Sequence, residues 1–268
     1  MPSKPLIIGH RGSSATAPEN TLAAFRVALD SGADGIEFDV RLTRDGVPVV
    51  IHDDNLRRTG SRPERVAELS YDEISNIDVG SWFNRIHPLS RIDFSGEKIP
   101  SLDAVLELFE SNNALLYLEM KSDPRQRDEL VQICCDHLRR SRVKDRTIIE
   151  CFDLAGIAAV KAIDPAIRTA ALLEPRLMTA PLISGSRLVK LTLTARADEI
   201  ALHHRLATER IVAAARKAGL KVVIWTVDDP AWILHAARME VSALITNDPA
   251  MMLKHAQPQR HPDTKTQM

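Results

Sequence analysis

The amino-acid sequence predicts an α/β fold, a (β/α)8 TIM barrel with a small insertion after His52. Short apolar runs of strand type alternate with segments of helical periodicity along most of the chain. Such alternation indicates parallel strands joined by crossover helices. Nine runs have strand character, and one is the returning arm of a hairpin, so eight β/α units remain. The length of 268 residues suits one barrel of this type.

The expected strands are short, apolar and rich in β-branched residues. They lie at residues 6–8, 35–42, 47–52, 115–120, 147–151, 168–173, 199–202, 221–226 and 243–246. The expected helices begin at capping residues or at proline and often end at glycine. Four of them are expected to start after Asn20 or Thr21, at Ser101, at Thr208 and at Asp229-Pro230. The other three are expected over residues 125–140, 154–163 and 176–183. The run at 188–193 is ambiguous between strand and helix.

The hairpin at residues 35–52 gathers three candidate site residues. Asp45-Gly46 between two β-branched runs is a strong hairpin signal. A two-residue turn there places Asp39 directly across from His52. Glu37 lies two residues from Asp39, so both carboxylates occupy the same face of the strand. The hairpin therefore brings two carboxylates and an imidazole together.

A third acidic residue, Glu119, ends another expected strand together with Lys121. Active sites of such barrels lie at the carboxyl ends of the strands. Acidic residues within apolar strands are costly unless they are paired or bind a metal. The three carboxylates, Glu37, Asp39 and Glu119, therefore predict a divalent cation, Mg²⁺ or Ca²⁺, because both prefer oxygen ligands. The alternative is a structural ion pair of these acids with Arg11 or Lys121.

His10 and Arg11 follow the first strand, at the same rim of the predicted barrel. Two histidines beside a metal site are typical of phosphoester cleavage, which needs one base and one acid near neutral pH. Trp225, at the end of a later strand, either lines the pocket or packs in the core. Structural roles are favoured for His203, Cys151 and Asp248. The adjacent pair His203-His204 would point to opposite faces of a strand and could not form a metal pair.

Composition excludes several classes of function. The net charge of −1 provides no basic field for nucleic acid, and three cysteines, two of them adjacent, indicate no disulfide framework. No run approaches the roughly 18 apolar residues of a membrane span, and no secretory signal is visible. We expect a cytoplasmic protein with a small-molecule substrate, and the sequence leaves its oligomeric state open.

Several motifs occur in the order typical of one enzyme family. They are His10-Arg11-Gly12 with Pro18-Glu19-Asn20-Thr21, residues 35–40, residues 45–53, residues 118–121, Trp225-Thr226-Val227 and residues 245–249. Over residues 6–253 the chain thus resembles the glycerophosphodiester phosphodiesterase family. The resemblance implies a barrel of the phosphatidylinositol-phospholipase type with a small inserted region after the second histidine.

The resemblance also implies a reaction, the metal-dependent hydrolysis of glycerophosphodiesters to sn-glycerol 3-phosphate and an alcohol. The implied roles are metal binding for Glu37, Asp39 and Glu119, acid–base catalysis for His10 and His52, phosphate contact for Arg11 and Lys121, and contact with the alcohol for Trp225. We assign His10 as base and His52 as acid, although the sequence does not fix that order.

Two alternatives stay open at this stage. A lysophospholipase D would use the same catalytic set and would need an apolar groove, to which Trp82, Phe83 and Ile86 could contribute. The same residues could instead anchor the insertion. A non-catalytic barrel that binds a phosphate ligand is the other alternative, although no implied ligand or histidine is missing. The expected organisation is a domain at 1–256 with an inserted cap region at about 54–100, and a disordered tail at 257–268.

Overall fold

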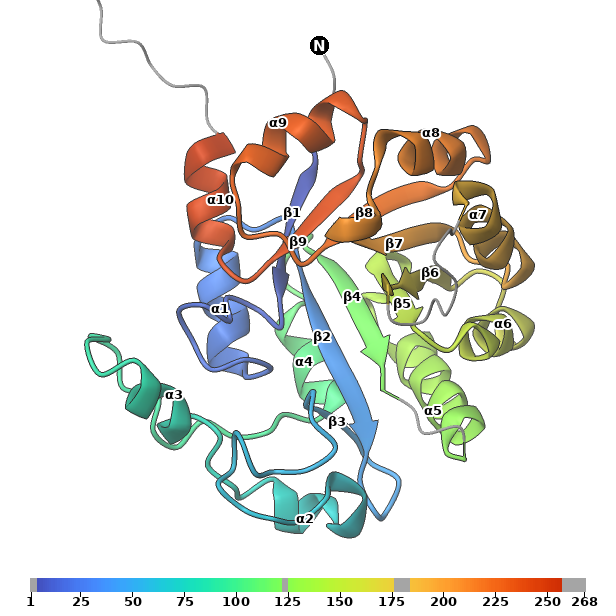
Figure 1. Ribbon diagram of the computed structural model, residues 1–268. Coiled ribbons are helices and arrows are strands. Elements are labelled where there is room, and N and C mark those ends of the chain that lie inside the picture. The colour runs from blue at the N-terminus through green and yellow to red at the C-terminus, as the bar shows by residue number, and fades with distance from the viewer. Residues whose placement is uncertain (1–3, 122–124, 176–183, 257–268) are drawn as a thin grey trace, which may run out of the picture.

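Parallel strands close into a barrel surrounded by helices in the computed structural model, which describes residues 4–121, 125–175 and 184–256 (Figure 1). The strands of the described chain are β1 (Leu6–His10), β2 (Gly35–Leu42), β3 (Pro48–Val50), β4 (Leu115–Met120), β5 (Thr147–Cys151), β6 (Arg168–Leu173), β7 (Glu199–His203), β8 (Lys221–Trp225) and β9 (Ala243–Thr246). Their order is β1-β9-β8-β7-β6-β5-β4-β2-β3, and pairing of β1 with β2 closes the ring. Strand β3 is antiparallel to β2, and the other pairs are parallel, so the predicted barrel is confirmed.

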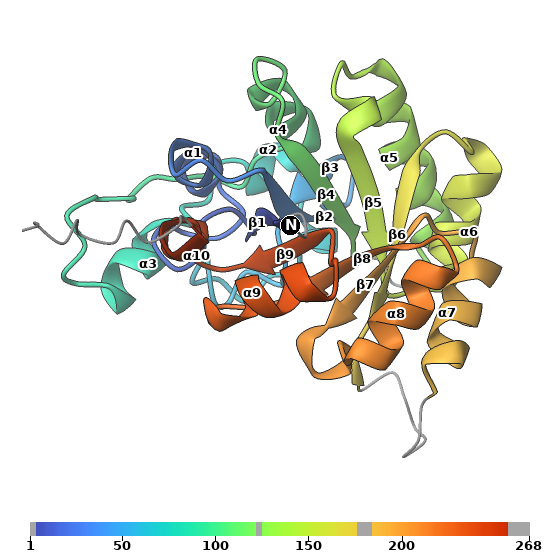
Figure 2. The same cartoon turned by 90° about the horizontal axis from the view of Figure 1, so that it is seen from above.

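Helices cover the outside of the barrel, as the view from above in Figure 2 shows for α5 to α8. The helices are α1 (Leu22–Asp30), α2 (Tyr71–Ile74), α3 (Ser81–Ile86), α4 (Leu102–Leu108), α5 (Arg127–Arg140), α6 (Leu154–Ile163), α7 (Gly185–Thr194), α8 (Glu209–Lys217), α9 (Ala231–Arg238) and α10 (Pro249–Ala256). Thr21, Ser101 and Thr208 cap α1, α4 and α8 as predicted, because each side-chain oxygen accepts a backbone N–H of the first turn. Among the helices described, none is long and apolar enough to cross a membrane.

The strands alternate between two apolar layers. On β2, Phe38 and Val40 are fully buried against the surrounding helices, in one cluster with Phe25 of α1 and Leu118 of β4. A second, smaller cluster fills the inside of the barrel and includes Ile8. Side chains along a strand alternate between its two faces. Because Phe38 points outward, its neighbours in β2, Glu37 and Asp39, point inward. That inward row of β2 carries the carboxylates.

The register of the β2–β3 hairpin differs from the prediction by one residue. Val40 pairs with Val50, and a three-residue loop at 44–46 ends at Gly46 with φ +78°, the left-handed conformation that such loops require. Asp39 therefore lies opposite Ile51, whose N–H donates to the Asp39 carbonyl at 2.9 Å. His52 still reaches the site because β3 has ended and the chain bends at that residue.

Four other expectations are resolved, corrected or fall outside the described structure. The ambiguous run at 188–193 belongs to the helix α7, and Pro230 is the N-cap residue of α9 rather than its first helical residue. The weak helix expected at 176–183 and the tail at 257–268 lie outside the described residues.

The segment between β3 and α4 contains the short helices α2 and α3 and lies to one side of the barrel strands (Figure 1). Leu56 and Ile74 of this segment pack in one apolar cluster with Val49 of β3, and Phe83 packs in another with Ala24 of α1. Arg58 ties the segment to the barrel mouth, with ion pairs of 2.7 Å to Glu19 and 2.8 Å to Asp53. The segment is thus folded against the rim on which the site lies.

Candidate active site

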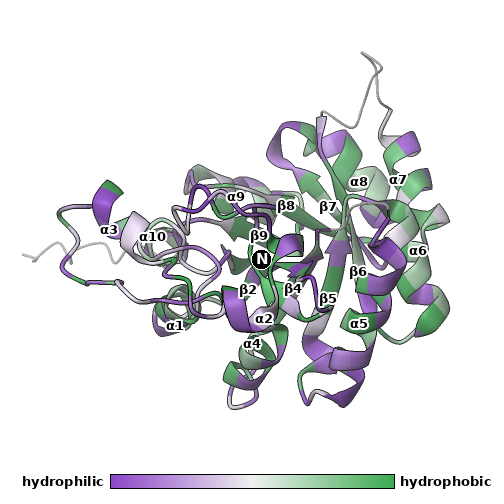
Figure 3. Ribbon diagram, turned by 90° about the horizontal axis from the view of Figure 1, so that it is seen from below, coloured by the Kyte–Doolittle hydropathy of each residue, from purple (hydrophilic) through white to green (hydrophobic). Residues whose placement is uncertain are grey.

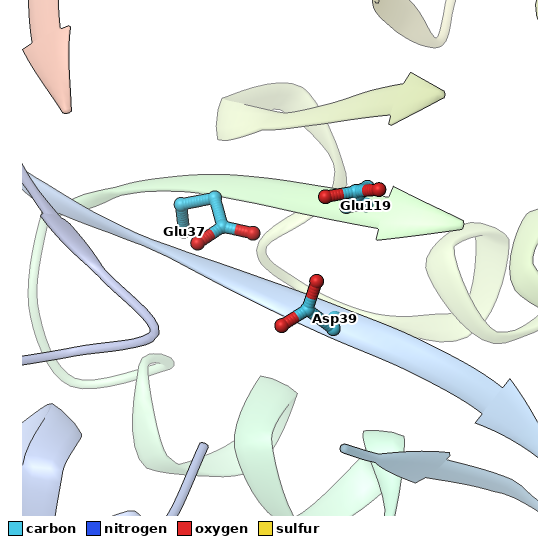
Figure 4. A group of neighbouring side chains, drawn as sticks. All are labelled: Glu37, Asp39 and Glu119. Carbon is cyan, nitrogen blue, oxygen red and sulfur yellow. The ribbon is translucent and has the colours of Figure 1, made fainter. Parts of the chain in front are cut away.

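Three buried carboxylates meet on two adjacent strands (Figure 4). Glu37 and Asp39 point inward from β2, and Glu119 points inward from β4, where it is the register partner of Asp39. One oxygen of each carboxylate lies within 4.8 Å of the others, and the residues are 2%, 0% and 7% exposed. The predicted metal ligands are therefore brought together by the parallel pairing of β2 with β4.

Two cationic side chains approach this cluster. Lys121 Nζ lies 3.1 Å from Asp39 Oδ1 and 2.6 Å from Glu119 Oε1, and Arg11 Nε lies 3.2 Å from Asp39 Oδ2. Arg11 also pairs with Glu19 at 2.8 Å. The ion pairs expected under the structural alternative are thus present. However, two positive charges do not neutralise the negative charges of three carboxylates.

Glu37 is the carboxylate left over. Its Oε2 accepts the backbone N–H of Arg11 at 3.0 Å, whereas its buried Oε1 has no hydrogen-bond partner in the described structure. Burial and the neighbouring Asp39 charge raise the pKa of Glu37 well above its ordinary value, and burial raises the pKa of Glu119 to about 7. Burial alone would also raise the pKa of Asp39, but Lys121 and Arg11 hold it well below its ordinary range. A surplus of buried carboxylate oxygens fits a hard divalent cation.

His10, the last residue of β1, borders this cluster. Its Nε2 is 3.8 Å from Glu37 Oε2, and its Nδ1 is 2.7 Å from the amide oxygen of Asn247. Asp228 in turn holds Asn247, accepting its side-chain NH₂ at 2.7 Å and its backbone N–H at 2.8 Å. Burial and the Arg11 charge lower the pKa of His10 to about 4, so this imidazole is neutral at pH 7.

His52 has a different partner. Its Nδ1 is 2.8 Å from a carboxylate oxygen of Asp53, and the other oxygen of Asp53 pairs with Arg58 at 2.8 Å. The two histidines therefore have unlike neighbours, because an amide oxygen orients His10 and a carboxylate orients His52.

One pocket joins these groups. The residues that line it are His10, Arg11, Glu37, His52, Glu119, Lys121, Glu150, Phe152, Leu172, Glu174, Trp225 and Ile245. Seven of the eight predicted site residues are among them, and the eighth, Asp39, lies beneath Arg11 and Lys121. Trp225 donates its indole N–H to the Ala201 carbonyl at 3.1 Å, which fixes the ring at the wall of the pocket.

The structure adds three residues that sequence reasoning missed. Asn20 donates to Asp39 Oδ2 at 2.7 Å and accepts the Asp39 backbone N–H at 3.2 Å, although the sequence suggested a helix cap. Asn247, which the sequence marked only as part of the motif at 245–249, orients His10. Glu150 is the register partner of Glu119 on β5 and is 1% exposed. An acid inside the apolar strand at 147–151 was a signal of the same kind as Glu119.

The weaker candidates have structural roles or differ from expectation. Cys151 packs on the helix side of β5 with its thiol donating to the Met120 carbonyl at 3.3 Å, and Asp248 accepts a first-turn N–H of α10, from Met251, at 2.8 Å. The expectation that His203 and His204 point apart is wrong, because β7 ends between them and their rings lie 4.2 Å apart.

The aromatic residues considered for an apolar groove divide into two kinds. Phe83 is 2% exposed and packs edge-on against Phe94, while Trp82 packs against Phe83 and beneath the guanidinium of Arg58. These two side chains anchor the segment between β3 and α4. Ile86, in contrast, is 59% exposed.

Comparison with known proteins identifies the family. Residues 10–251 match the sequence profile of the Glycerophosphoryl diester phosphodiesterase family. The chain belongs to this family. It is 31% identical to the glycerophosphodiester phosphodiesterase of Caldanaerobacter subterraneus subsp. tengcongensis over 256 residues, which is 93% of this chain and 97% of that protein. The resemblance found in the motifs is therefore confirmed, and the protein is a phosphodiester hydrolase.

Solved structures of the family share its fold. A glycerophosphodiester phosphodiesterase from Agrobacterium tumefaciens is 29% identical, with a TM-score of 0.76 over 93% of this chain and 99% of its own. A phosphodiesterase from Oleispira antarctica, in complex with the product sn-glycerol-3-phosphate, is 26% identical, with a TM-score of 0.82 over 94% of this chain and 96% of its own.

Proposed function

We propose that this phosphodiesterase hydrolyses glycerophosphodiesters to sn-glycerol 3-phosphate and an alcohol, with a divalent cation held by Glu37, Asp39 and Glu119. The observation that carries the proposal is the surplus of buried carboxylate, with Glu37 Oε1 unpartnered among the described residues. The Oleispira antarctica relative with bound sn-glycerol-3-phosphate supports the choice of product.

An all-carboxylate ligand set favours Mg²⁺ or Ca²⁺ over zinc. When bound, such a cation supplies Lewis-acid stabilisation of the phosphodiester, worth several kcal/mol. Arg11 and Lys121 line the same pocket and present their cationic heads to the carboxylate cluster. They would bind the phosphate oxygens there, and Trp225 would line the alcohol side.

The neighbours of the two histidines support distinct roles. The Asn247 amide oxygen accepts from His10 Nδ1–H, which leaves the lone pair on Nε2 directed toward the carboxylate cluster. His10 would therefore take the proton from the nucleophile, which is either water or the glycerol 2-hydroxyl. Attack by the 2-hydroxyl would give a cyclic phosphate that water then opens to glycerol 3-phosphate. Asp53 contacts His52 Nδ1 and would orient its ring, and His52 would donate a proton to the leaving alcohol oxygen.

The test is release of glycerol 3-phosphate from glycerophosphocholine and glycerophosphoethanolamine, with Mg²⁺, with Ca²⁺ and with EDTA. We expect turnover with at least one cation and none in EDTA. His10→Ala and His52→Ala should each lower kcat/KM about 10²- to 10⁴-fold, the usual contribution of general acid–base catalysis.

His235→Ala is the matched control, because His235 lies on α9 outside the pocket. It should retain parental turnover. Full activity in EDTA would refute the metal role, and folded His10→Ala and His52→Ala proteins with parental rates would refute the acid–base assignment.

A further inference from the structure

The segment Arg85–Ile92, here called the tip, is an exposed apolar surface at the end of α3. In Figures 1 and 3 this helix stands apart from the barrel strands. Ile86, Leu89 and Ile92 are 59%, 95% and 56% exposed, and they are three of the seven large apolar side chains exposed in the described chain. Such a concentration marks an interaction surface, whereas apolar residues exposed singly carry no such meaning.

The tip is held in place from within. Phe83, one turn earlier on α3, is buried, and its ring stacks on His87 with centroids 4.2 Å apart. Asn84 accepts the backbone N–H of Phe94 at 3.2 Å, which fixes the returning chain. The apolar side chains of the tip therefore face outward on a folded support.

The tip is also positively charged. Arg85 and Arg91 lie among the apolar side chains, and the nearest acidic residue in the sequence is Asp93, whose Oδ1 accepts hydrogen bonds from Asn84 and from the Ser95 backbone N–H. Within the described residues neither arginine has a carboxylate partner, and Arg85 donates to the Ser61 hydroxyl at 3.0 Å. Apolar side chains next to unpaired arginines fit a membrane surface with anionic headgroups.

Three hollows between the tip and the candidate catalytic pocket share lining residues. Ile86 lines a groove with Ala15 and Thr16, and Ala15 also lines a second hollow, together with His10 and Arg11. His10 and Arg11 in turn line the catalytic pocket. The tip therefore lies on the same side of the molecule as the candidate catalytic histidines.

We propose that the tip docks on a lipid surface with anionic headgroups. Ile86, Leu89 and Ile92 would enter the interface, and Arg85 and Arg91 would contact the lipid phosphates. This binding is additional to hydrolysis and does not depend on which glycerophosphodiester is cleaved. It would place the groove beside a membrane surface.

Co-sedimentation with vesicles tests the proposal. The probes are vesicles of phosphatidylcholine alone and of phosphatidylcholine with about 30% phosphatidylglycerol. The parent should bind the anionic vesicles, and a protein carrying Ile86→Asp, Leu89→Asp and Ile92→Asp should bind them at least ~10-fold more weakly. Leu234→Asp is the matched control, because Leu234 is 57% exposed on α9, and it should bind like the parent.

A second pair of variants tests the charges. Arg85→Gln with Arg91→Gln should lower anionic binding about 5-fold or more, whereas Arg142→Gln, at a side chain 85% exposed on another face, should not. Equal binding to neutral and anionic vesicles would overturn the anionic-surface proposal. So would equal binding by the parent and the triple-aspartate protein, or no vesicle binding by the parent.

Two further measurements distinguish lipid docking from misfolding of the variant and from self-association. Hydrolysis of soluble glycerophosphocholine should be unchanged in the triple-aspartate protein. An unchanged rate would show that this variant is folded. A parent that binds vesicles but hydrolyses neither glycerophosphocholine nor glycerophosphoethanolamine would refute the proposed function and still support lipid docking by the tip. Sedimentation velocity without vesicles completes the test. A parent that dimerises while the triple-aspartate protein stays monomeric would identify a second copy as the occupant and overturn the proposal.

Discussion

Two clusters of buried polar groups lie inside the same barrel, and they are satisfied to different degrees. Glu199 opens β7, and both of its oxygens have partners, Arg168 at 2.5 Å and the Tyr117 hydroxyl at 3.0 Å. At the other cluster, Glu37 has one buried oxygen without a hydrogen bond in the described structure. Buried polar groups are normally paired, so the unpaired oxygen of Glu37 supports the proposed cation site. The Glu199 cluster has the full set of partners expected of a structural cluster, whereas the Glu37 cluster has a surplus of carboxylate.

The largest expected effect contrasts the two carboxylates directly. Glu37→Gln keeps the shape of the side chain but removes its charge, and we expect kcat/KM to fall about 10³-fold or more, as loss of several kcal/mol of transition-state stabilisation implies. Its melting temperature in EDTA should be equal to the parental value or higher, because a surplus buried charge is removed. Activity assays with Mg²⁺ and Ca²⁺, together with thermal melts, measure both.

Glu199→Gln is the matched control. It should lower the melting temperature, while kcat/KM of the folded protein stays within a few-fold of the parental value. A folded Glu199→Gln protein that is as inactive as Glu37→Gln would show that the two clusters do not divide stability from chemistry.

Arg168→Met should give the next largest effect, on stability alone. It leaves Glu199, whose side chain is 1% exposed, without its cation, and removal of one partner of a buried pair is strongly destabilising. Arg168 itself is 30% exposed, which weakens the pair, so we expect a loss of about 2 to 4 kcal/mol in urea unfolding. Arg142→Met, at an exposed arginine, should change stability by less than about 0.5 kcal/mol. A stability unchanged by Arg168→Met would mean that the Glu199 cluster contributes nothing to the fold.

Much of the fold could be predicted from the sequence because it depends on local patterns. Strand β4 and helix α6 have the predicted bounds. An apolar run defines the strand, and a capping residue marks the start of the helix. The hairpin register could not be fixed in this way. A loop of two or of three residues fits the same Asp45-Gly46 signal, and the choice depends on the conformation of Gly46 in the folded chain.

The candidate site was predictable where acids interrupt apolar strands, as Glu37 and Glu119 do. The roles of Asn20 and Asn247 could not be found, because each makes a contact across a long sequence separation and its residue type also suits a helix start. The extent of the inserted cap region, 54–100, stays a prediction. The tip lies within that range.

A pH dependence of stability would sharpen the contrast between the clusters. In the metal-free protein, burial raises the pKa of Glu119 to about 7, and burial with the Asp39 charge raises the pKa of Glu37. Between about pH 4 and pH 7 the folded state therefore binds more protons than the unfolded chain. Stability contributed by these groups is present below the unfolded pKa and is lost as the pH rises through the folded pKa, by roughly 1 kcal/mol per pH unit for each group.

Urea unfolding in EDTA at about pH 5 and about pH 8 measures this slope. Glu119→Gln should flatten it, and saturating cation should restore stability at the higher pH, because the metal binds the deprotonated ligands. A flat profile for the parent in EDTA would contradict the raised pKa values of Glu37 and Glu119.

The smallest expected effect concerns the hydroxyl that completes the Glu199 cluster. Tyr117→Phe removes the donor to Glu199 Oε2 and should cost about 1 kcal/mol of stability without changing kcat/KM. Tyr71→Phe, at the chain's other tyrosine, should be close to neutral. Because Tyr117 and Arg168 serve the same carboxylate, their combined loss should differ from the sum of the single losses by more than about 0.5 kcal/mol. Simple additivity would mean that the two residues act independently, and Glu199 would then not be the centre of a satisfied cluster.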